Sequence, residues 1–536
     1  MVKTLKHKKN SIKLTLVKIA SVVYIMCFLS LHSCNSSMNY SKIHIDVNTK
    51  FQAMDGFGAS DAWRCQFVGA NWPEEKKERI AELLFSKDLD KNGNPKGIGL
   101  SIWRFYIGAG TTEQGEASGI KNEWRRAESF IDSNGNYNWD KQKGQQWFLR
   151  KAQSYGVEKF LAFSISAPVQ WTKNGKGYNS DLVSGSLNLQ EDKYDDYAAF
   201  MVEVLKYFKS QGIDFNYLSP INEPQWEWEK KTQEGTPATN AEISRLTQLI
   251  NAKIDNSNLD TQLTLAEAAD LRWLYSEFNK SKRGNQIEYF FGESGTVKEY
   301  PHVKNVISGH SYFTTWPVDS LISIRQKLND KLQEHDVDYW QSEFCILENT
   351  DDIGGGRKRD LGMDTALYVA RVIHADITLA NASSWQWWTA LTNADYKDGL
   401  IYLDTGNQRD LFNLDNMKSD GNFHDSKLLW AFGNYSRFIR PGMTRVKINL
   451  NDEDKTLIES YKNLMLSAYV DEKTSKLVIV AINYGSENQT IDFSEYEIDS
   501  KFETSQDKNL EFEKIINKKI TIKGRTINTL IGSLPN

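Results

Sequence analysis

The sequence predicts an α/β fold, a (β/α)8 TIM barrel with a small antiparallel β-sandwich domain attached to it. Three observations lead to this prediction. Between residues 55 and 440, eight short apolar runs alternate with amphipathic helical patterns, as such a barrel requires. The Gly-rich phosphate loop that usually opens a doubly wound sheet, the alternative fold, is absent. After about Arg440 helical periodicity is lost, and short β-branched segments separated by turn residues follow.

The alternation can be followed element by element through the predicted barrel, residues 55–440. The candidate strands are residues 56–58, 98–107, 160–165, 215–221, 263–266, 306–312, 337–343 and 383–388. In several of the segments between them, apolar residues recur at steps of three and four, the period of an amphipathic helix. The candidate helices are residues 74–85, 140–154, 192–209, 240–255, 320–333 and 363–379.

The predicted sandwich takes up residues 441–536. Its candidate strands are residues 464–470, 477–484, 490–493 and 519–522. Residues 34–54 form a separate N-terminal piece in which Ile43, Ile45 and Val47 alternate with polar residues, the pattern of a half-buried strand. We expect this strand to pack into the same sandwich, which brings the two ends of the chain together.

Residues 1–33 are predicted to be a lipoprotein signal peptide rather than part of the fold. Six lysines and no acidic residue precede an apolar run of 13 residues at positions 19–31, too short for a comfortable membrane span. The run ends in Leu31-His32-Ser33-Cys34, which resembles a bacterial lipobox, with Cys34 as the lipid attachment site. The alternative is a plain signal peptide cut nearby, with Cys34 incidental. We expect an exported monomer, lipid-anchored to the bacterial cell envelope at the outer membrane or periplasmic face, with no other contact with the membrane.

Charge and composition narrow the classes of partner. Removal of the leader and its six lysines lowers the net charge from -5 to -11, which argues against nucleic acid and favours a neutral substrate. Beyond the leader and Cys34, only Cys65 and Cys345 remain, too few for a disulfide framework. The histidines show no pair at metal-ligand spacing, so neither a metal nor another cofactor is expected.

Two glutamates occupy the positions where a barrel places its chemistry. Glu223 is expected at the end of the fourth strand, in Asn222-Glu223-Pro224, and Glu343 at the end of the seventh. Catalytic residues lie at the C-terminal ends of barrel strands, and strands four and seven face each other across the barrel mouth. Cleavage of a glycosidic bond needs one carboxylic acid and one carboxylate. Either glutamate alone is equally compatible with a helix cap or an ion pair, but Asn222 adds an amide beside Glu223 that can bind a sugar hydroxyl.

The motifs resemble those of glycoside hydrolase family 30, in which a β-sandwich built from both chain ends sits beside the barrel. The matching segments are GFGAS at 56–60, WRFYIGAG at 103–110, SISAPVQWT at 164–172 and SPINE at 219–223. Within the family, QWEW at 225–228 and QEGTP at 233–237 resemble the endo-β-1,6-galactanase branch. Ala167 stands where many relatives carry Pro, which puts the shape of the third βα loop in doubt. The resemblance implies a retaining mechanism with Glu223 as acid/base and Glu343 as nucleophile.

Three further residues of the predicted site come from the barrel strands, on the resemblance and the sequence together. Arg104, at the end of strand two, would hold a catalytic carboxylate ionised, or else form an ordinary buried ion pair. His310 and Tyr312 lie two residues apart and would share one face. Tyr312 is expected to bond the nucleophile and His310 a sugar hydroxyl, while a structural role remains open for each.

Four aromatic and acidic side chains complete the prediction. Trp387 is expected to form the floor under the reacting sugar, although Trp385 shares its strand face and either can belong to the core. Trp171 would form a wall of the same subsite. Asp61 would reach a sugar hydroxyl or cap the segment after it. Trp226 would stack a sugar on the leaving-group side or pack the fourth βα loop.

The predicted function is that of an endo-β-1,6-galactanase that cleaves a β-linked neutral polysaccharide with retention. Within the same family, a β-1,6-glucanase or an exo-acting β-fucosidase or β-xylosidase remains open, because pocket shape decides between such sugars. A non-catalytic carbohydrate-binding lipoprotein would keep the aromatic residues and lose a carboxylate, but both carboxylates are present. A lipase or esterase is excluded because no Gly-x-Ser-x-Gly elbow occurs.

Overall fold

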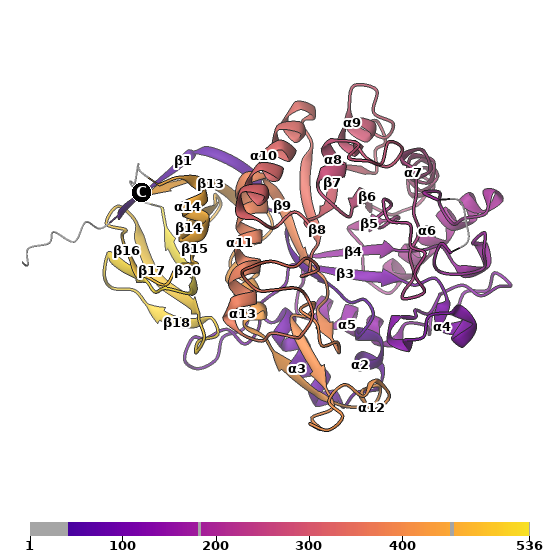
Figure 1. The fold of residues 1–536 in the computed structure, drawn as a ribbon, viewed down its shortest axis with the longest axis horizontal. Helices are drawn as coiled ribbons and strands as arrows, with labels where there is room; N and C mark the ends of the chain where they lie inside the picture. The colour runs from indigo at the N-terminus through magenta and orange to yellow at the C-terminus, as the bar shows by residue number, and fades with distance from the viewer. Residues whose placement is uncertain (1–40, 181–183, 451–454, 535–536) are drawn as a thin grey trace, which may run out of the picture. The chain divides into compact units, whose positions relative to one another are not determined.

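The structure is a computed structural model that describes residues 41–180, 184–450 and 455–534 (Figure 1). The predicted signal peptide and Cys34 lie outside these residues. From Ile43 onward the chain forms one compact unit. Within the described ranges, no helix combines the length and the apolar character needed to cross a membrane.

Eight parallel strands close into a barrel, as the sequence predicts. They are β2 (Gly56–Ser60), β3 (Ile102–Ile107), β4 (Lys159–Ser164), β5 (Tyr217–Ser219), β6 (Gln262–Ala268), β7 (Val303–His310), β8 (Asp338–Glu343) and β9 (Ala382–Trp387). The barrel closes where β2 pairs with β9, with Gly56 opposite Ser384. Every predicted run overlaps a strand, but residues 98–101 precede β3, and β5 is only three residues long.

Helices follow the strands and pack against the barrel. The longer ones are α3 (Glu74–Phe85), α5 (Lys143–Ser154), α6 (Tyr194–Ser210), α7 (Asn240–Asp255), α10 (Val318–His335), α11 (Met363–Leu379) and α13 (Lys427–Ser436). The shorter ones are α2 (Cys65–Asn71), α4 (Thr111–Gln114), α8 (Arg272–Tyr275), α9 (Gln286–Phe291) and α12 (Leu414–Met417). For three helices, α3, α7 and α11, the predicted first and last residues are those of the structure. In α7 the reason is local, because Thr239 and Glu242 form a capping box that marks its start.

The remaining strands form a nine-stranded sheet in the order β18-β17-β20-β15-β14-β13-β1-β16-β19. They are β1 (Ser41–Ala53), β13 (Thr444–Leu450), β14 (Leu464–Asp471), β15 (Lys476–Asn483), β16 (Gln489–Asp492), β17 (Glu497–Thr504), β18 (Glu511–Lys514), β19 (Lys519–Ile522) and β20 (Thr526–Ser533). Strand β1 pairs antiparallel with β13, with His44 opposite Asn449. A strand from the N-terminal side thus lies inside the sheet of the C-terminal segment. A separate three-stranded sheet contains β10 (Leu391–Thr392), β11 (Ile401–Asp404) and β12 (Asn422–Asp425).

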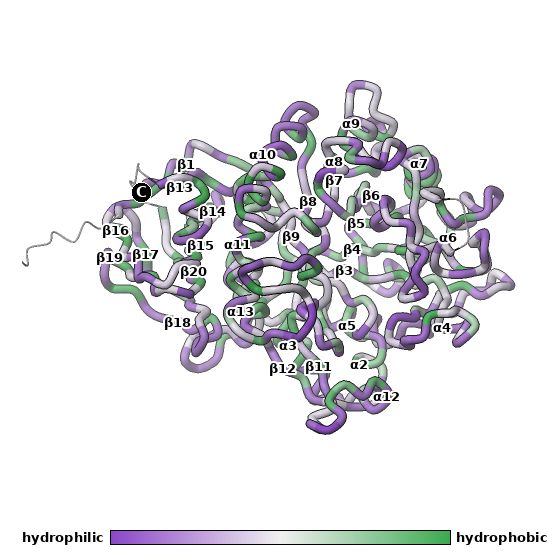
Figure 2. The backbone as a smooth tube through the Cα atoms, viewed as in Figure 1, coloured by the Kyte–Doolittle hydropathy of each residue, from purple (hydrophilic) through white to green (hydrophobic). Residues whose placement is uncertain are grey.

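The nine-stranded sheet folds over its own hydrophobic core. Ile491 of β16 and Ile520 of β19 share one buried cluster with Ile479 of β15 and with Ile43 of β1. Figure 2 shows hydrophobic and hydrophilic residues alternating along this sheet, with hydrophilic residues gathered in the outer loops near α4 and α12. The expectation that helical structure ends at Arg440 is wrong in one place. Helix α14 (Leu457–Lys462) interrupts the strands, and it begins at a capping box that the sequence carries at Thr456 and Glu459.

Candidate active site

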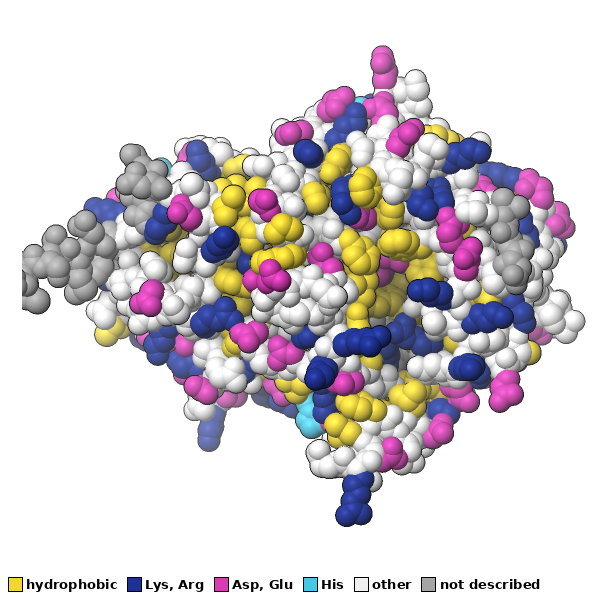
Figure 3. All heavy atoms as spheres, in the orientation of Figure 1, with side chains coloured by type: hydrophobic (Ala, Val, Ile, Leu, Met, Phe, Trp, Pro, Cys, Tyr) yellow, Lys and Arg dark blue, Asp and Glu magenta, His cyan; other side chains and the backbone are white. Residues whose placement is uncertain are grey.

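A cavity of about 320 Å³ opens at the C-terminal ends of the barrel strands. Glu223, Glu343, Tyr312, Trp228 and Trp388 are among its lining residues. Figure 3 shows hydrophobic side chains gathered on the surface in the region where Figure 1 places β4, β7 and β8. The cavity therefore joins two carboxylates to an apolar surface, which suits a sugar with polar edges and apolar ring faces.

The two predicted catalytic glutamates meet in this cavity. Glu343 is the last residue of β8. Glu223 lies four residues beyond the end of β5, which corrects the expectation that it ends the strand. Its backbone has φ +47° and its N–H donates to the carbonyl of Glu267 at 3.0 Å. A ligand oxygen of Glu223 lies within 4.8 Å of one of Glu343. This separation is close to the roughly 5–5.5 Å of retaining glycosidases and shorter than the roughly 6.5–9.5 Å of inverting ones.

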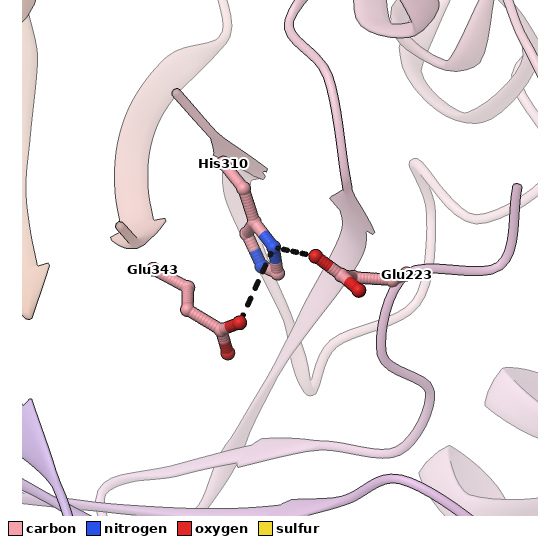
Figure 4. A group of neighbouring side chains, drawn as sticks. All are labelled: Glu223, His310 and Glu343. Carbon is pink, nitrogen blue, oxygen red and sulfur yellow. Dashed lines mark hydrogen bonds and ion pairs between the residues drawn. The ribbon is translucent and has the colours of Figure 1, made fainter. Parts of the chain in front are cut away.

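His310 is the last residue of β7 and lies between the carboxylates (Figure 4). Its Nδ1 is 2.9 Å from Oε1 of Glu223 and 3.8 Å from Oε1 of Glu343. Its Nε2 is 3.0 Å from Oε2 of Glu267. The side chain is fully buried and both ring nitrogens are engaged. His310 therefore contacts the acid, and the expected contact with a sugar hydroxyl is not available to it.

Arg104 and Tyr312 hold Glu343 from two sides. The Nη1 of Arg104 donates to Oε2 of Glu343 at 2.5 Å, and its Nη2 donates to Oδ1 of Asn222 at 3.1 Å. The hydroxyl of Tyr312 donates to Oε1 of Glu343 at 3.1 Å. Each Glu343 oxygen thus accepts one hydrogen bond, so the side chain is held in one orientation. The amide oxygen of Asn222 is occupied by Arg104, which leaves its nitrogen for the cavity.

Burial and neighbouring charges set the protonation of the cluster. Burial raises the pKa of Glu223, and the Glu343 carboxylate adds to this effect against the opposing influence of His310. Burial alone would lower the pKa of His310, but the carboxylates of Glu343, Glu223 and Glu267 outweigh it and raise this pKa to about 9. Burial alone would raise the pKa of Glu267, yet Arg104 and His310 hold it below the ordinary value. The raised pKa of Glu223 favours the protonated form that a general acid needs, beside the charged imidazole of His310.

The ligand atoms of Glu223, His310 and Glu343 are close enough together to surround a metal ion. Two features of the residues oppose this use. A protonated imidazole has no lone pair to offer, and the Arg104 guanidinium already occupies one oxygen of Glu343. The chemistry of this donor set is therefore that of paired carboxylates.

Two predicted aromatic contacts need correction. Trp387 is only 1 % exposed, stacks on Trp385, and donates its Nε1–H to the carbonyl of Asp398 at 3.1 Å. Its neighbour Trp388 lines the cavity instead, because the chain leaves the strand after Trp387. Trp171, half-buried on a 3-10 turn (η3, Val169–Trp171), packs edge-on against Phe200 and is not among the cavity-lining residues.

Asp61 and Trp226 also lie outside the cavity lining. Asp61 is buried, and its Oδ1 accepts the backbone N–H of Tyr106 at 2.9 Å, a contact that the sequence did not predict, while its Oδ2 has no partner among the described residues. Its burial raises the pKa of its carboxyl to about 8. Trp226 is 36 % exposed and contacts Trp273 and Phe313 edge-on, with ring centroids 5.4 and 6.0 Å away. It therefore belongs to an exposed aromatic surface formed by Trp226, Phe313 and Phe278.

Glu267, on β6, is a member of the cluster that the sequence analysis missed. It bonds His310, accepts from the hydroxyl of Ser342, and lies 3.7 Å from Arg104. The predicted strand ended at residue 266, one position earlier. The available signal was an acidic residue next to the last position of a mostly apolar strand, much as Glu343 is the last residue of β8. Trp228 was also missed as a wall of the cavity, and its Nε1–H donates to the carbonyl of Glu223 at 3.1 Å.

Comparison with known proteins agrees with this geometry. The chain is 24% identical over 470 residues to an endo-β-1,6-galactanase of Hypocrea rufa, covering 84% of this chain and 82% of that protein. A conserved exported protein from Bacteroides fragilis has a structure with a TM-score of 0.86 and 37% sequence identity, covering 91% of this chain and 100% of that one. The catalytic domain of xylanase C from Talaromyces cellulolyticus shares the fold, with a TM-score of 0.65, 19% identity, and coverage of 92% and 100%.

The family assignment rests on a match to a family model. Residues 40–402, more than half of the chain, match the model of O-glycosyl hydrolase family 30. This stretch contains all eight barrel strands, Glu223, Glu343 and the residues that bond them. The protein is therefore a glycoside hydrolase and belongs to O-glycosyl hydrolase family 30.

Proposed function

We propose that this glycosidase is an endo-β-1,6-galactanase acting with retention. The observation that carries the mechanism is the separation of the two carboxylates, within 4.8 Å between ligand oxygens. Glu343, held by Arg104 and Tyr312, attacks the anomeric carbon while protonated Glu223 gives its proton to the departing oxygen. Glu343 is then part of the covalent intermediate and carries no charge. Glu223 acts as base on the incoming water, and hydrolysis restores the anomeric configuration.

Two observations support the substrate. The relative from Hypocrea rufa, which aligns along most of the chain, is an endo-β-1,6-galactanase. The exposed aromatic surface of Trp226, Phe313 and Phe278 offers ring faces on which the sugars of a long chain stack. Phe313 follows Tyr312, which bonds the nucleophile, so this surface begins beside the catalytic site. A chain that extends past the cleaved bond is the substrate of an endo-acting enzyme.

The substrate is tested by incubating the enzyme in parallel with de-arabinosylated arabinogalactan, β-1,6-glucan and aryl glycosides, with the product sizes analysed over time. We expect a mixture of short galacto-oligosaccharides. Cleavage of the glucan without cleavage of the galactan would favour a β-1,6-glucanase. Release of monosaccharide alone from the first minutes would favour an exo-acting β-fucosidase or β-xylosidase. Proton NMR of the first sugar released tests the mechanism independently, because a β-linked substrate must yield the β-anomer first.

We also propose that the enzyme is an exported monomer, anchored to the bacterial cell envelope through a lipid on Cys34. The support is the sequence of the leader and its lipobox-like end. Growth of the expressing bacterium with labelled palmitate should label the wild-type protein and leave the Cys34→Ser variant unlabelled. Equal labelling of both, or of neither, would contradict the lipid anchor, and size-exclusion chromatography tests the monomer.

A further inference from the structure

Asp398 lines the active-site cavity and carries a buried oxygen that has no partner among the described residues. The residue is 4 % exposed. Its Oδ2 accepts from Nη2 of Arg64 at 3.4 Å, while its Oδ1 accepts nothing. A buried polar atom left without a hydrogen bond costs about 1–3 kcal/mol. Such an atom in the wall of a substrate cavity is satisfied when the substrate supplies a donor.

The carboxylate is fixed in place from both ends. The carbonyl of Asp398 accepts the Nε1–H of Trp387 and the backbone N–H of Thr389, the two neighbours of Trp388. Asp398 is thereby tied to the segment that presents Trp388 to the cavity. Its partner Arg64 is held in turn, because its Nε donates to Oδ1 of Asn393 at 3.3 Å. The free oxygen therefore keeps its position without rearrangement when a sugar enters.

A guanidinium accompanies this oxygen in the same wall. Arg125 lines the cavity, donates from Nη1 to Oε1 of Gln233 at 2.8 Å, and lies 4.6 Å from the centre of the Trp63 ring. Arg64 faces the same indole at 5.7 Å. Two cations beside a single carboxylate repel a metal ion, so the partner of Asp398 is a neutral donor. A sugar hydroxyl donates one hydrogen bond and accepts others, which matches an acceptor oxygen and a guanidinium that line the same cavity.

We propose that Asp398 and Arg125 are specificity-determining residues that read two neighbouring hydroxyls of the sugar whose bond is cleaved. Asp398 accepts a hydrogen bond from one hydroxyl, and Arg125 donates one to the next hydroxyl on the same ring. Because Glu343 must lie under the anomeric carbon that it attacks, the ring in this cavity is the one that becomes attached to the enzyme. This inference rests on the proposed glycosidase reaction, and it deepens it by assigning the residues that choose the sugar.

The test pairs single variants with single deoxygenations of the substrate. The wild type is first assayed on aryl β-galactoside, β-glucoside, β-fucoside and β-xyloside, and the monodeoxy derivatives of the best substrate are then used. Asp398→Asn keeps an oxygen for Arg64 and turns the cavity acceptor into a donor. We expect kcat/KM to fall about 10- to 100-fold on the parent sugar, as for the loss of a hydrogen bond to a charged group. On the deoxy derivative that lacks the hydroxyl bound by Asp398, the kcat/KM values of the wild type and the variant should agree within about threefold.

Arg125→Gln should also lower kcat/KM on the parent sugar. Its kcat/KM should equal that of the wild type on a different deoxy derivative, the one that lacks the hydroxyl next to the hydroxyl bound by Asp398. Asp395→Asn is the matched control, because Asp395 follows Asn393 in the same loop, is exposed, and binds the backbone of Arg359 outside the cavity. The Asp395→Asn variant should have the wild-type kcat/KM on the parent sugar and on every deoxy derivative. Circular dichroism and thermal unfolding establish that each variant is folded, and Arg125→Gln carries the test if Asp398→Asn does not fold.

An equal loss across every deoxy derivative in folded variants, or no loss on any, would overturn the assignment. Failure of the galactanase proposal looks different. If the wild type accepts the glucoside and rejects the galactoside, the galactan assignment is wrong, whereas the deoxyglucoside series still tests Asp398 and Arg125.

Discussion

The Nδ1 atom of His310 lies 2.9 Å from Oε1 of Glu223, so the proposed acid/base is bonded to a side chain with a pKa of about 9. At neutral pH this contact joins an imidazolium to the catalytic acid. The Glu267 carboxylate on the other ring nitrogen keeps the imidazole charged and fixes its orientation. The proposed catalytic pair is thus the part of a larger ionic cluster that lines the cavity, and the rest of the cluster extends into the barrel.

The charge of His310 should make stability depend on pH. Its pKa in the folded state lies above the usual 6.5, so its contribution is fully present below about pH 6.5 and is lost as the pH rises through 9. The difference between these values corresponds to at most about 3 kcal/mol. Urea unfolding between pH 6 and 10 should show the wild type losing more free energy of unfolding than His310→Asn. Parallel curves for the two proteins would contradict the charged state.

The raised pKa of Glu223 should set the alkaline limit of activity. Because the first step needs a protonated acid, kcat/KM should fall as Glu223 ionises, at a pH above that of an ordinary glutamate. With a dinitrophenyl glycoside, whose leaving group needs no proton, the first step in Glu223→Gln should lose this alkaline limb. Stopped-flow measurement of the first turnover checks the expectation. An unchanged limb in the variant would assign the limit to another group.

Removal of either catalytic carboxylate should abolish turnover without unfolding the barrel. Glu223→Gln and Glu343→Gln should each cost at least about 10³-fold in kcat. With an activated aryl glycoside, azide should rescue Glu223→Ala to give the β-azide, whereas any product of Glu343→Ala should be the α-azide. Glu229→Gln, an exposed glutamate near Glu223 in the chain, is the control and should keep full activity. Near-normal turnover in either catalytic Gln variant would disprove the assignment.

Trp226 should matter for long chains and little for small substrates. Its exposed ring offers a surface beyond the cavity, so Trp226→Ala should reduce kcat/KM on galactan about three- to tenfold, since a contact with an aromatic ring contributes roughly 0.5–1.5 kcal/mol. Hydrolysis of an aryl galactoside should change less than twofold. Trp139→Ala is the comparison, because Trp139 stacks on Tyr207 and does not line the cavity. Equal losses on both substrates would mean that Trp226 only packs its loop.

The barrel could be predicted from the sequence because hydrophobic periodicity reports it directly. Both glutamates also stood out, since each follows an apolar run. The finer placement depended on where each strand stops. β5 ends at Ser219, so Glu223 is placed by a turn rather than by the strand. One residue past β9 the alternation of faces breaks down, and Trp388 rather than Trp387 enters the cavity.

Other misassignments arose from partners that are distant in sequence. Oδ1 of Asp61 accepts the backbone N–H of Tyr106, and the two ring nitrogens of His310 lie within hydrogen-bond distance of Glu223 and Glu267. No local pattern announces such a contact. Glu267 itself carries no motif, and its role follows only from the closure of the barrel, which brings β6, β7 and β8 side by side.

The pairing of β1 with β13 imposes an order of events on synthesis. His44 and Asn449, which face each other in the sheet, are about 400 residues apart in the chain. At roughly 5–20 residues per second, translation delivers the second strand about 20–80 s after the first. All eight barrel strands are complete in that interval, while the apolar side of β1, with Ile43 and Ile45, has no partner strand to cover it. A chain arrested before Thr444 therefore contains every catalytic residue named above and still presents an uncovered, aggregation-prone strand.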